Sequence, residues 1–437
     1  MRPASLRVVS LIALAAVLAA LSAPSPAAAE RRAKHVVLVD WDGFDADYLA
    51  RAQLPNLRRL VERGSLTIAS STFHTVSNPA RASMSTGAYP EIHDNAAYYF
   101  DPIANAARGQ ERFLAAETIA EALAAEGRTI ASVQWYMVQN HGTGYGDPEH
   151  LYVQPGGDFG RRVDVAIDIL QRRPVDSGGQ QVTVPRIPDL LAVYGDGPDS
   201  LGHREGAESP AMSELLAEMD DDLGRLVQAT KDVGIYGETA FLLTSDHGMT
   251  SWSRTLLPQL LATISTAGYR AEVVTPGRSP AADSEVIVVP NAVRQGDITL
   301  RGRAATADGR EDVRSALQSL SPTYIADVLD ESDHRALRAS RKLGDLTAEA
   351  QPPYGFALSE PAAGEQRGSH GSRAELQVPL LLAGAGIRRG VNPRDPVLVD
   401  VAPTIAALLG TRPPAQAQGR VLGEALGPAA PQGAAGR

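Results

Sequence analysis

The chain has 437 residues, of which 43% are hydrophobic and 21% charged, a composition typical of globular proteins and unlike that of disordered chains. Its 41 basic and 51 acidic residues give a net charge of -10, so the sequence lacks the basic surface that binding of nucleic-acid polymers requires. Cysteine is absent, which excludes disulfides, thiolate catalysis and cysteine-ligated metals and leaves histidine, carboxylate and hydroxyl groups for any site chemistry.

The first predicted element is a secretory signal peptide at residues 1–29. Arg2 and Arg7 precede an apolar run from Val8 to Leu21, and three alanines stand at a cleavage point before Glu30. An uncleaved membrane anchor is the alternative, but the run has about 14 residues where a membrane-spanning helix needs roughly 20. We therefore expect export to the periplasm or the extracellular space, with no membrane span after cleavage.

Strands then alternate with helices along residues 30–251 and 367–426. The predicted strands are the apolar run after Lys34, Thr129 to Tyr136, Leu190 to Tyr194, Thr239 to Ser245 and Val378 to Ala383. The predicted helices are Asn56 to Arg63, Glu117 to Glu126, Met212 to Lys231 and Ala402 to Leu409. Because short apolar strands that alternate with helices are typical of a parallel sheet, we expect an α/β fold with helices on both faces of a mostly parallel central sheet.

Two further regions depart from this alternation. Between residues 252 and 366 the pattern loosens, with short strands at Glu285 to Val289 and Tyr324 to Val328 among polar turns, which predicts an inserted α+β cap subdomain over one edge of the main sheet. Residues 427–437 are rich in alanine, glycine and proline, which predicts a disordered tail.

Acids and histidines stand next to the predicted strands at four places, three of them just after a strand and the fourth just before the strand that begins at Val378. These are Asp42, Asp199 with His203, Asp246 with His247, and His370. Since ligands bind at the carboxyl ends of parallel strands, we expect these side chains to meet there. A mixed set of carboxylates and imidazoles is what two zinc-like divalent ions would require. Taken singly, Asp42 could cap a helix, Asp199 and His203 could form a surface ion pair, and His370 could be a turn residue.

Ser77 is the candidate nucleophile, in a segment that reads Ser77-Asn-Pro79-Ala-Arg81. A serine hydroxyl needs a base or a metal ion to act as a nucleophile at neutral pH, and the G-x-S-x-G motif of serine hydrolases is absent from the sequence. Activation by a metal ion is the remaining route. The alternative is that Ser77 caps the helix that begins there.

As a set, these motifs resemble the alkaline phosphatase superfamily and, within it, the type I phosphodiesterase and nucleotide pyrophosphatase branch. The resemblance covers nearly all of the chain after residue 30. The motifs that carry it are Val36 to Gly43, Leu54-Pro-Asn-Leu57, Ser77-x-Pro79, Thr86-Gly-x-Tyr-Pro-Glu-x-His93, Asp199-x3-His203, Ser245-Asp-His-Gly-Met249, His370-Gly371 and Asp400 to Gly410.

The resemblance implies an alkaline-phosphatase-like fold and a site for two divalent ions, expected to be zinc. It places Asp199, His203 and His370 on one ion and Asp42, Asp246 and His247 on the other, with Ser77 as the covalent nucleophile and a metal contact. In that branch the nucleophile is more often threonine, so serine is a departure. The branch also holds a phosphoryl oxygen with an asparagine, for which Asn95 is the nearest candidate, about three residues short of the usual spacing.

The implied activity is hydrolysis of a small phosphoester, with nucleotides among the candidate substrates, through a phosphoseryl intermediate. Phosphomonoester or phosphonate hydrolysis is the nearest alternative. No Lys-x-Arg cluster follows Tyr136, which favours a diester over a dianionic monoester. Arg81 has two expected roles, contact with the substrate phosphate or pairing with an acid. The sequence does not indicate an oligomeric state.

Two alternatives lie outside phosphoester chemistry. The spacing Ser77-x-Pro79-x-Arg81 is similar to the serine-type sulfatase motif, in which the hydroxyl residue is oxidised to formylglycine. Sulfatases of that type use a single calcium-type site opened by adjacent aspartates, whereas Asp40 and Asp42 flank a tryptophan here. The other alternative is a non-catalytic metal-binding protein, but three side chains per ion leave a position open, as in catalytic zinc sites.

Overall fold

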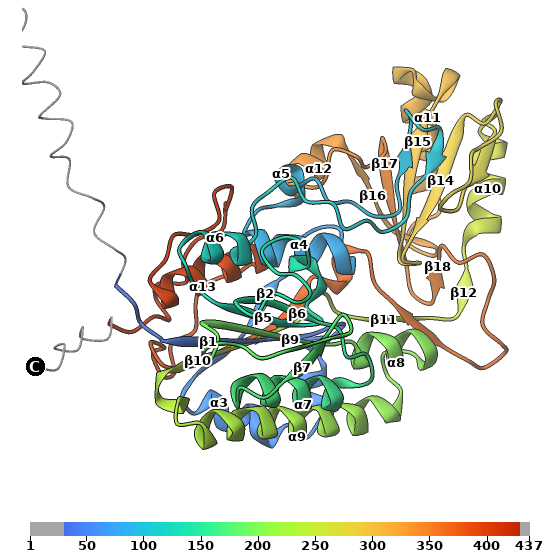
Figure 1. The fold of residues 1–437 in the computed structure, drawn as a ribbon. Helices are drawn as coiled ribbons and strands as arrows, with labels where there is room; N and C mark the ends of the chain where they lie inside the picture. Colours follow the sequence, from blue (N-terminus) through green and yellow to red (C-terminus); the bar gives the residue numbers. More distant parts are fainter. Residues whose placement is uncertain (1–29, 429–437) are drawn as a thin grey trace, which may run out of the picture.

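The computed structural model describes residues 30–428, which form a large α/β domain with a smaller α+β subdomain beside it (Figure 1). The predicted signal peptide, and residues 429–437 of the predicted disordered tail, lie outside the described residues. Among residues 30–428, no helix combines the length and the apolar character that crossing a membrane requires.

The main sheet has seven strands and is parallel except for one of them. In spatial order its strands are β2 (Gly64–Ser70), β20 (Gln377–Gly384), β10 (Thr239–Thr244), β1 (His35–Trp41), β9 (Leu190–Gly195), β5 (Ile130–Val133) and β6 (His150–Val153). β20 pairs antiparallel with both β2 and β10, whereas β1 pairs parallel with β10 and β9. The predicted mostly parallel sheet is therefore confirmed.

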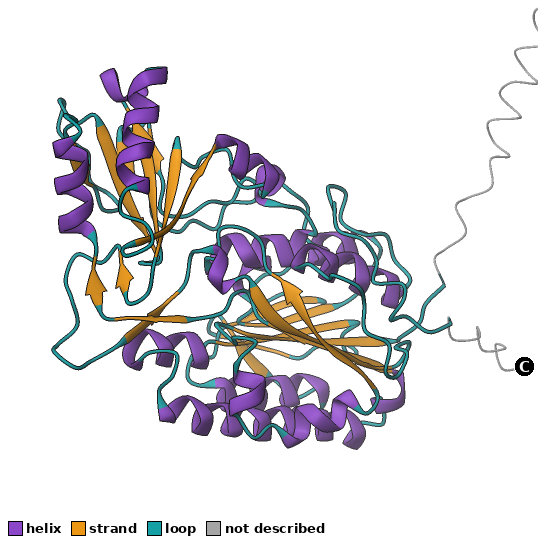
Figure 2. Cartoon of the chain, turned by 180° about the vertical axis from the view of Figure 1, so that it is seen from behind, coloured by secondary structure: helices purple, strands orange, loops and turns teal. Residues whose placement is uncertain are grey.

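Alternate residues of β1 pack against helices on opposite faces of this sheet (Figure 2). Val37 and Val39 face one side and Val36 and Leu38 the other, and all four are buried. The first face is covered by α3 (Pro55–Val61), α7 (Phe159–Leu170) and α9 (Pro210–Asp232), and the second by α4 (Ser77–Thr86), α6 (Ile119–Ala125) and α13 (Val401–Leu409). Burial on both faces explains why β1 reads as a continuous apolar run.

Two local predictions differ from the structure. No strand was expected after Gly64, yet β2 begins there at the edge of the sheet, because its partner β20 comes from far along the chain. The strand expected to reach Tyr136 ends at Val133, and residues 136–138 form a short 3-10 helix, η1 (Tyr136–Val138). This turn directs Trp135 toward Asp40 and Tyr136 toward Arg81.

The smaller subdomain has its own five-stranded sheet and its own core within residues 252–366. In spatial order its strands are β13 (Ala271–Val273), β14 (Val286–Asn291), β15 (Gln295–Leu300), β17 (Leu346–Ala350) and β16 (Ile325–Asp330). Its helices are α10 (Leu257–Thr266), α11 (Ala307–Gln318) and α12 (Glu331–Ala336). Leu260, Val288 and Val313 belong to one buried cluster that joins α10 and α11 to the sheet.

Two short strand pairs join the subdomain to the main domain (Figure 1). β11 (Thr250–Trp252) pairs antiparallel with β19 (Arg367–Ser369), and β12 (Arg254–Thr255) pairs parallel with β18 (Tyr354–Gly355). Because β11 follows β10 and β19 precedes His370, these pairs place the subdomain next to the carboxyl ends of the central strands.

Candidate active site

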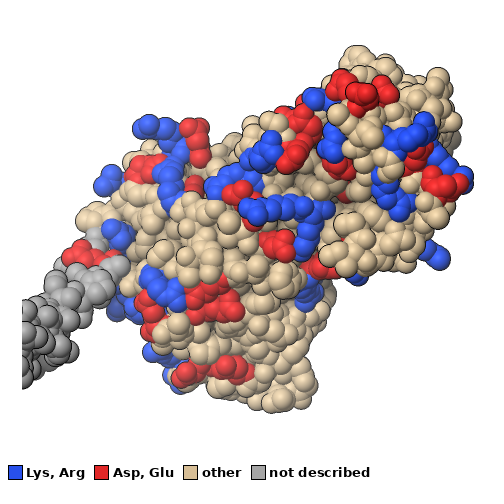
Figure 3. All heavy atoms as spheres, turned by 90° about the horizontal axis from the view of Figure 1, so that it is seen from above, with Lys and Arg blue, Asp and Glu red and all other residues tan. Residues whose placement is uncertain are grey.

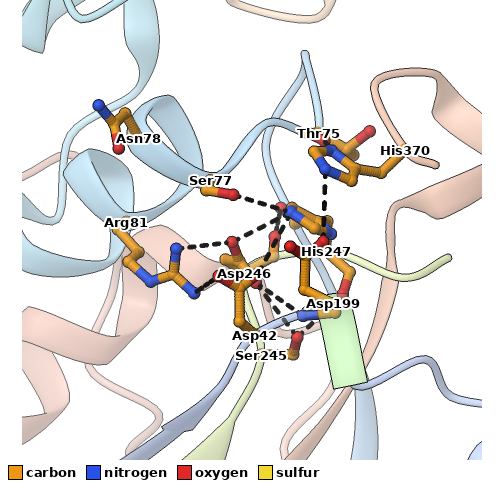
Figure 4. Close-up of polar contacts among 12 residues, drawn as sticks. Asp42, Thr75, Ser77, Asn78, Arg81, Asp199, Ser245, Asp246, His247 and His370 are labelled. Atoms are coloured by element: carbon orange, nitrogen blue, oxygen red, sulfur yellow. Dashed lines mark hydrogen bonds and ion pairs between the residues drawn. The ribbon is translucent and has the colours of Figure 1, made fainter. Parts of the chain in front are cut away.

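The predicted metal ligands meet at the carboxyl edge of the main sheet (Figure 4). Asp42 directly follows β1, and Asp246 and His247 follow the neighbouring strand β10. Asp199 and His203 lie on α8 (Gly197–Glu205), which follows β9 on the other side of β1. Adjacent parallel strands end at the same edge, so residues from three distant segments come together there.

The first group consists of Asp199, His203 and His370, as expected. Their ligand atoms all lie within 4.8 Å of one another. Asp199 Oδ1 is 3.2 Å from His203 Nε2 and 3.5 Å from His370 Nε2. One carboxylate oxygen that faces two imidazole nitrogens is an arrangement suited to a divalent cation.

The second group differs in one member from the expected trio of Asp42, Asp246 and His247. Asp42, Asp199 and His247 bring their ligand atoms within 4.8 Å of one another. Asp246 lies beside them, with its Oδ2 3.2 Å from His247 Nε2. Asp199 therefore belongs to both groups, and the two groups adjoin.

All three imidazoles are oriented by backbone carbonyl groups that the sequence analysis did not identify. The Nδ1 atoms of His203, His247 and His370 lie 2.9, 2.9 and 2.8 Å from the carbonyl oxygens of Gly368, Gly248 and Thr75, respectively. A carbonyl oxygen only accepts, so each Nδ1 carries a proton and each Nε2 faces the acids of the cluster, where it can bind a metal ion when deprotonated. No residue type marks such a carbonyl in a sequence.

The acid oxygens of the cluster face other groups of the same cluster. Asp42 Oδ1 has no hydrogen-bond partner among the described residues, whereas Asp199 Oδ1 faces two imidazole nitrogens and Asp246 Oδ2 pairs with Arg81. Buried acids without enough positive charge are costly, and burial raises the pKa of Asp246 well above its usual range although Arg81 opposes this. These acid oxygens and oriented imidazoles match the donor set of divalent cations such as zinc.

The histidines of the first group differ in charge. Burial lowers the pKa of His203, but the hydrogen bond and charge of Asp199 outweigh this effect and raise the pKa to about 9. Burial together with His247 and His203 lowers the pKa of His370 well below its usual range. His370 is thus held neutral, as a ligand must be, whereas binding of a metal ion by His203 would release a proton.

Ser77 is the first residue of α4, and its hydroxyl faces the cluster (Figure 4). Its Oγ lies 3.2 Å from His247 Nε2. The helix cap is Val76, and no side chain caps this helix, so the alternative role of Ser77 as a helix cap is wrong. Asn78, the next residue, points away from the cluster and donates to the carbonyl of Glu111.

Arg81 lies below the cluster and not in the open site. It is completely buried, and its three nitrogens lie 2.6, 2.9 and 3.0 Å from carboxylate oxygens of Asp40, Asp42 and Asp246. Burial opposes its charge, but these acids raise the pKa of Arg81 above its ordinary value. Of its two expected roles, the geometry shows pairing with acids. The expected contact of Arg81 with the substrate phosphate is corrected, because its nitrogens are occupied by the three acids.

The structure does not bring Asn95 to Ser77 either. Asn95 is 1% exposed, and its Nδ2 donates to the carbonyls of Glu111 and Phe113 at 3.0 and 2.8 Å. The side chain therefore secures a loop, and the expected contact with a phosphoryl oxygen is corrected. Tyr98, three residues further along, does line the open cleft.

The cleft in front of Ser77 has a volume of about 430 Å³. The first group, Asp199, His203 and His370, forms one of its walls. Its remaining walls come from the main domain, the subdomain and the segment between β18 and β19, and include Tyr98, Gln110, Trp252, Ala292, Val293, Ser359, Glu360, Pro361 and Arg367. Trp252 contributes to the cleft although it is only 8% exposed.

The profile of the type I phosphodiesterase / nucleotide pyrophosphatase family matches residues 36–373. Human bis(5'-adenosyl)-triphosphatase ENPP4 is 23% identical over 392 residues, which is 86% of this chain and 78% of that protein. Human ectonucleotide pyrophosphatase/phosphodiesterase family member 5 is 26% identical over 255 residues, which is 56% of this chain. That match spans 51%, about half, of the length of the human protein.

Solved structures show the same fold. Human family member 5 superimposes with a TM-score of 0.65 at 21% identity, covering 87% of this chain and 96% of that chain. An inactive variant of the murine protein in complex with AMP gives a TM-score of 0.65 at 19% identity, with the same coverage. The predicted alkaline-phosphatase-like fold is confirmed by these neighbours.

Proposed function

This chain belongs to the type I phosphodiesterase / nucleotide pyrophosphatase family, and from that premise we propose that it is an exported, metal-dependent phosphodiesterase with Ser77 as its nucleophile. One observation carries the proposal. The Ser77 hydroxyl lines an open cleft, 3.2 Å from His247 Nε2 and beside two adjoining groups of carboxylates and imidazoles. A hydroxyl in this setting can attack a phosphorus atom that enters from the cleft.

The proposed cofactors are two divalent ions, which we take to be zinc. Asp199, His203 and His370 would hold one of them, and Asp42, Asp246 and His247 the other, with Ser77 in contact. Bound ions of this kind lower the pKa of a nearby hydroxyl and stabilise charge on phosphoryl oxygens. The carbonyl groups behind the three histidines keep each Nε2 directed inward, so the ligands are oriented in advance.

The reaction proceeds in two displacements. The Ser77 oxygen forms a bond to phosphorus, the bond to the first alcohol or phosphate leaving group breaks, and the proton lost by Ser77 leaves with that group. Water then attacks the phosphorus of the seryl phosphodiester, returns a proton to Ser77 and releases the remaining monoester as the second product. Ser77 lies at the amino end of α4, where the helix dipole favours the negative charge of the phosphoryl group.

The charges around the cleft favour a diester over a monoester. Arg367 is the one arginine or lysine among the described lining residues, and it lies 3.5 Å from Glu365. Arg81 is occupied by three acids below the cleft. A monoester brings two negative charges and a diester one, so a cleft with few free cations suits the diester. Figure 3 shows acids and bases interspersed on one face, in keeping with a small substrate and not a nucleic-acid polymer.

The test compares three substrates on metal-loaded protein that lacks residues 1–29. They are bis-p-nitrophenyl phosphate, p-nitrophenyl phosphate and p-nitrophenyl sulfate, followed by a dinucleotide because a murine relative was solved with AMP. We expect the diester to be preferred and Ser77→Ala to lower kcat on the order of 10⁴-fold or more. Ser85→Ala, the same change on the same helix, is the matched control because Ser85 only donates to the carbonyl of Ala82.

Each substrate points to a different outcome. Preference for the monoester would make the protein a phosphatase, and turnover of the sulfate alone would make it a sulfatase. Full activity of Ser77→Ala would remove the proposed nucleophile. Export is tested separately, since cleavage before Glu30 would give a mature chain of defined mass.

A further inference from the structure

Arg81 stands between two carboxylates of the cluster, those of Asp42 and Asp246. It follows Ser77 by one turn of α4 and is completely buried. Its Nη2 lies 2.9 Å from Asp42 Oδ2, and its Nη1 lies 3.0 Å from Asp246 Oδ2. One guanidinium group therefore spans two residues that are proposed to hold the same metal ion.

The guanidinium group is itself held in place on its remaining sides. Its Nε donates to Asp40 Oδ2 at 2.6 Å, and Trp135 donates to the same oxygen at 3.1 Å. Its carbon lies 4.5 Å from the ring centre of Tyr194 and 5.3 Å from that of Tyr136. The Tyr136 hydroxyl accepts from Nη1 at 2.8 Å. With Nε fixed by Asp40 and two tyrosine rings packed beside the group, the two terminal nitrogens have fixed positions.

Arg81 contacts one oxygen of each of the two carboxylates, and the second oxygens have different surroundings. Asp42 Oδ2 accepts from Tyr194 at 2.6 Å and pairs with Arg81, whereas Asp42 Oδ1 has no hydrogen-bond partner within residues 30–428 and lies 3.5 Å from His247 Nε2. Asp246 is fixed on its other side, where Oδ1 accepts from the Gly43 amide at 3.2 Å. Arg81 thus orients both carboxylates while Asp42 keeps one oxygen free for a cation.

We propose that Arg81, held by Asp40, is a positioning residue that fixes the separation of Asp42 and Asp246 and so supports the metal ion of that group alone. The inference rests on the proposed two-ion site. The effect of Arg81 should be confined to that ion, because among the described residues Arg81 contacts Asp42 and Asp246 but neither His203 nor His370. A positive charge next to a metal site also repels the ion. Loss of the positioning by Arg81 should therefore weaken metal binding, whereas loss of its charge alone should strengthen it.

The experiment measures zinc binding directly, by competition with a chromophoric chelator, on protein that lacks residues 1–29. The variant His203→Ala weakens the first group, so the remaining strong site reports the ion of Asp42, Asp246 and His247. In that background we expect Arg81→Lys to weaken zinc binding by about 10- to 100-fold, the usual cost of losing a residue that orients metal ligands. Lysine keeps the charge but cannot span both carboxylates.

Two further variants separate this role from a general loss of structure. Asp40→Ala keeps Arg81 and both ligand carboxylates in the sequence and removes the carboxylate that accepts from Arg81 Nε and from Trp135, so we expect it to weaken the same ion. Arg294→Lys is the matched control, since Arg294 is 1% exposed and pairs with Glu375 at 3.2 Å, and among the described residues no ion pair joins it to a proposed metal ligand. It should bind both ions like the wild type.

The outcomes are distinct. Wild-type protein that binds fewer than two ions would refute the two-ion site of the proposed function. Two ions in the wild type, with unchanged or tighter binding in both Arg81→Lys and Asp40→Ala, would overturn the role of Arg81. Equal weakening of both ions in the variants made without His203→Ala would also overturn it, because the effect would then not be confined to one group. If Arg81→Lys does not fold, Asp40→Ala decides.

Discussion

Two buried arginines in this protein have opposite surroundings. Arg81, below the cleft, pairs with three carboxylates, those of Asp40, Asp42 and Asp246. Arg294, at the start of β15, pairs with Glu375 and donates to the carbonyls of Tyr354 and Ala350 at 3.0 and 2.8 Å. The first cluster has an excess of negative charge, whereas the second is balanced.

This difference in charge balance distinguishes a candidate binding site, around Arg81, from a structural contact, around Arg294. A balanced buried pair whose other donors reach backbone carbonyls is complete without any further group. A cluster of three carboxylates around one arginine is not, and Asp199 adds a fourth carboxylate to its edge. Such a cluster is stable only with added protons or cations, so the surplus charge marks the place where a metal ion would bind.

The largest effect on stability is expected when the balanced pair of Arg294 and Glu375 is broken. Arg294→Met leaves the Glu375 carboxylate buried without its cation, which typically costs about 3–5 kcal/mol of unfolding free energy. Chemical denaturation would measure this loss, and zinc content of the folded variant would be measured alongside it. We expect normal zinc content. A variant that loses zinc while it remains folded would show that the Arg294 contact is not purely structural.

Another buried acid, Asp297, sharpens the comparison. It has no cation partner among the described residues. Burial raises its pKa from 3.8 to about 7, although backbone amides of Gly344 and Phe100 donate to it. The folded state therefore binds the proton more tightly, and the stabilisation present at low pH is lost as the pH rises from about 4 through about 7.

Asp297→Asn should abolish that pH dependence, because asparagine keeps the acceptor for the Gly344 amide and does not ionise. By linkage the difference between pH 4 and pH 8 is at most about 4 kcal/mol. Unfolding free energies of wild type and variant across this pH range would test it. Parallel curves for the two proteins would contradict a protonated Asp297 in the folded state.

The smallest expected effect, counted for a single metal site, concerns the cluster itself. If metal ions balance its charge, zinc at about 100 times its dissociation constant should stabilise the fold by about 3 kcal/mol for each site. A chelator should reverse this gain. Thermal unfolding of wild type and of Arg294→Met, with and without zinc, should show the same increment in both. No increment in either protein would mean that the cluster is not a metal site.

Much of the site could be predicted because its chemistry follows strand ends. Asp42, Asp246 and His247 stand directly after apolar runs, and Asp199 and His203 share a helix turn, so local patterns indicate that these residues meet at one edge. The family resemblance supplied the pairing of distant motifs. The roles of Arg81 and Asn95 could not be predicted in this way, because each depends on which neighbours the fold brings to the side chain.

By itself, the sequence determined the α/β class and which acids, histidines and serine were candidates for the site, since each depends on residue type and short spacing. Tertiary structure alone decided that Arg81 serves the carboxylates below the cleft, that Asn95 secures a loop and that β20 runs antiparallel. It also placed the Thr75 carbonyl behind His370, a contact across 295 positions of the chain. These outcomes depend on long-range packing, in which backbone groups that look alike in every sequence acquire different partners.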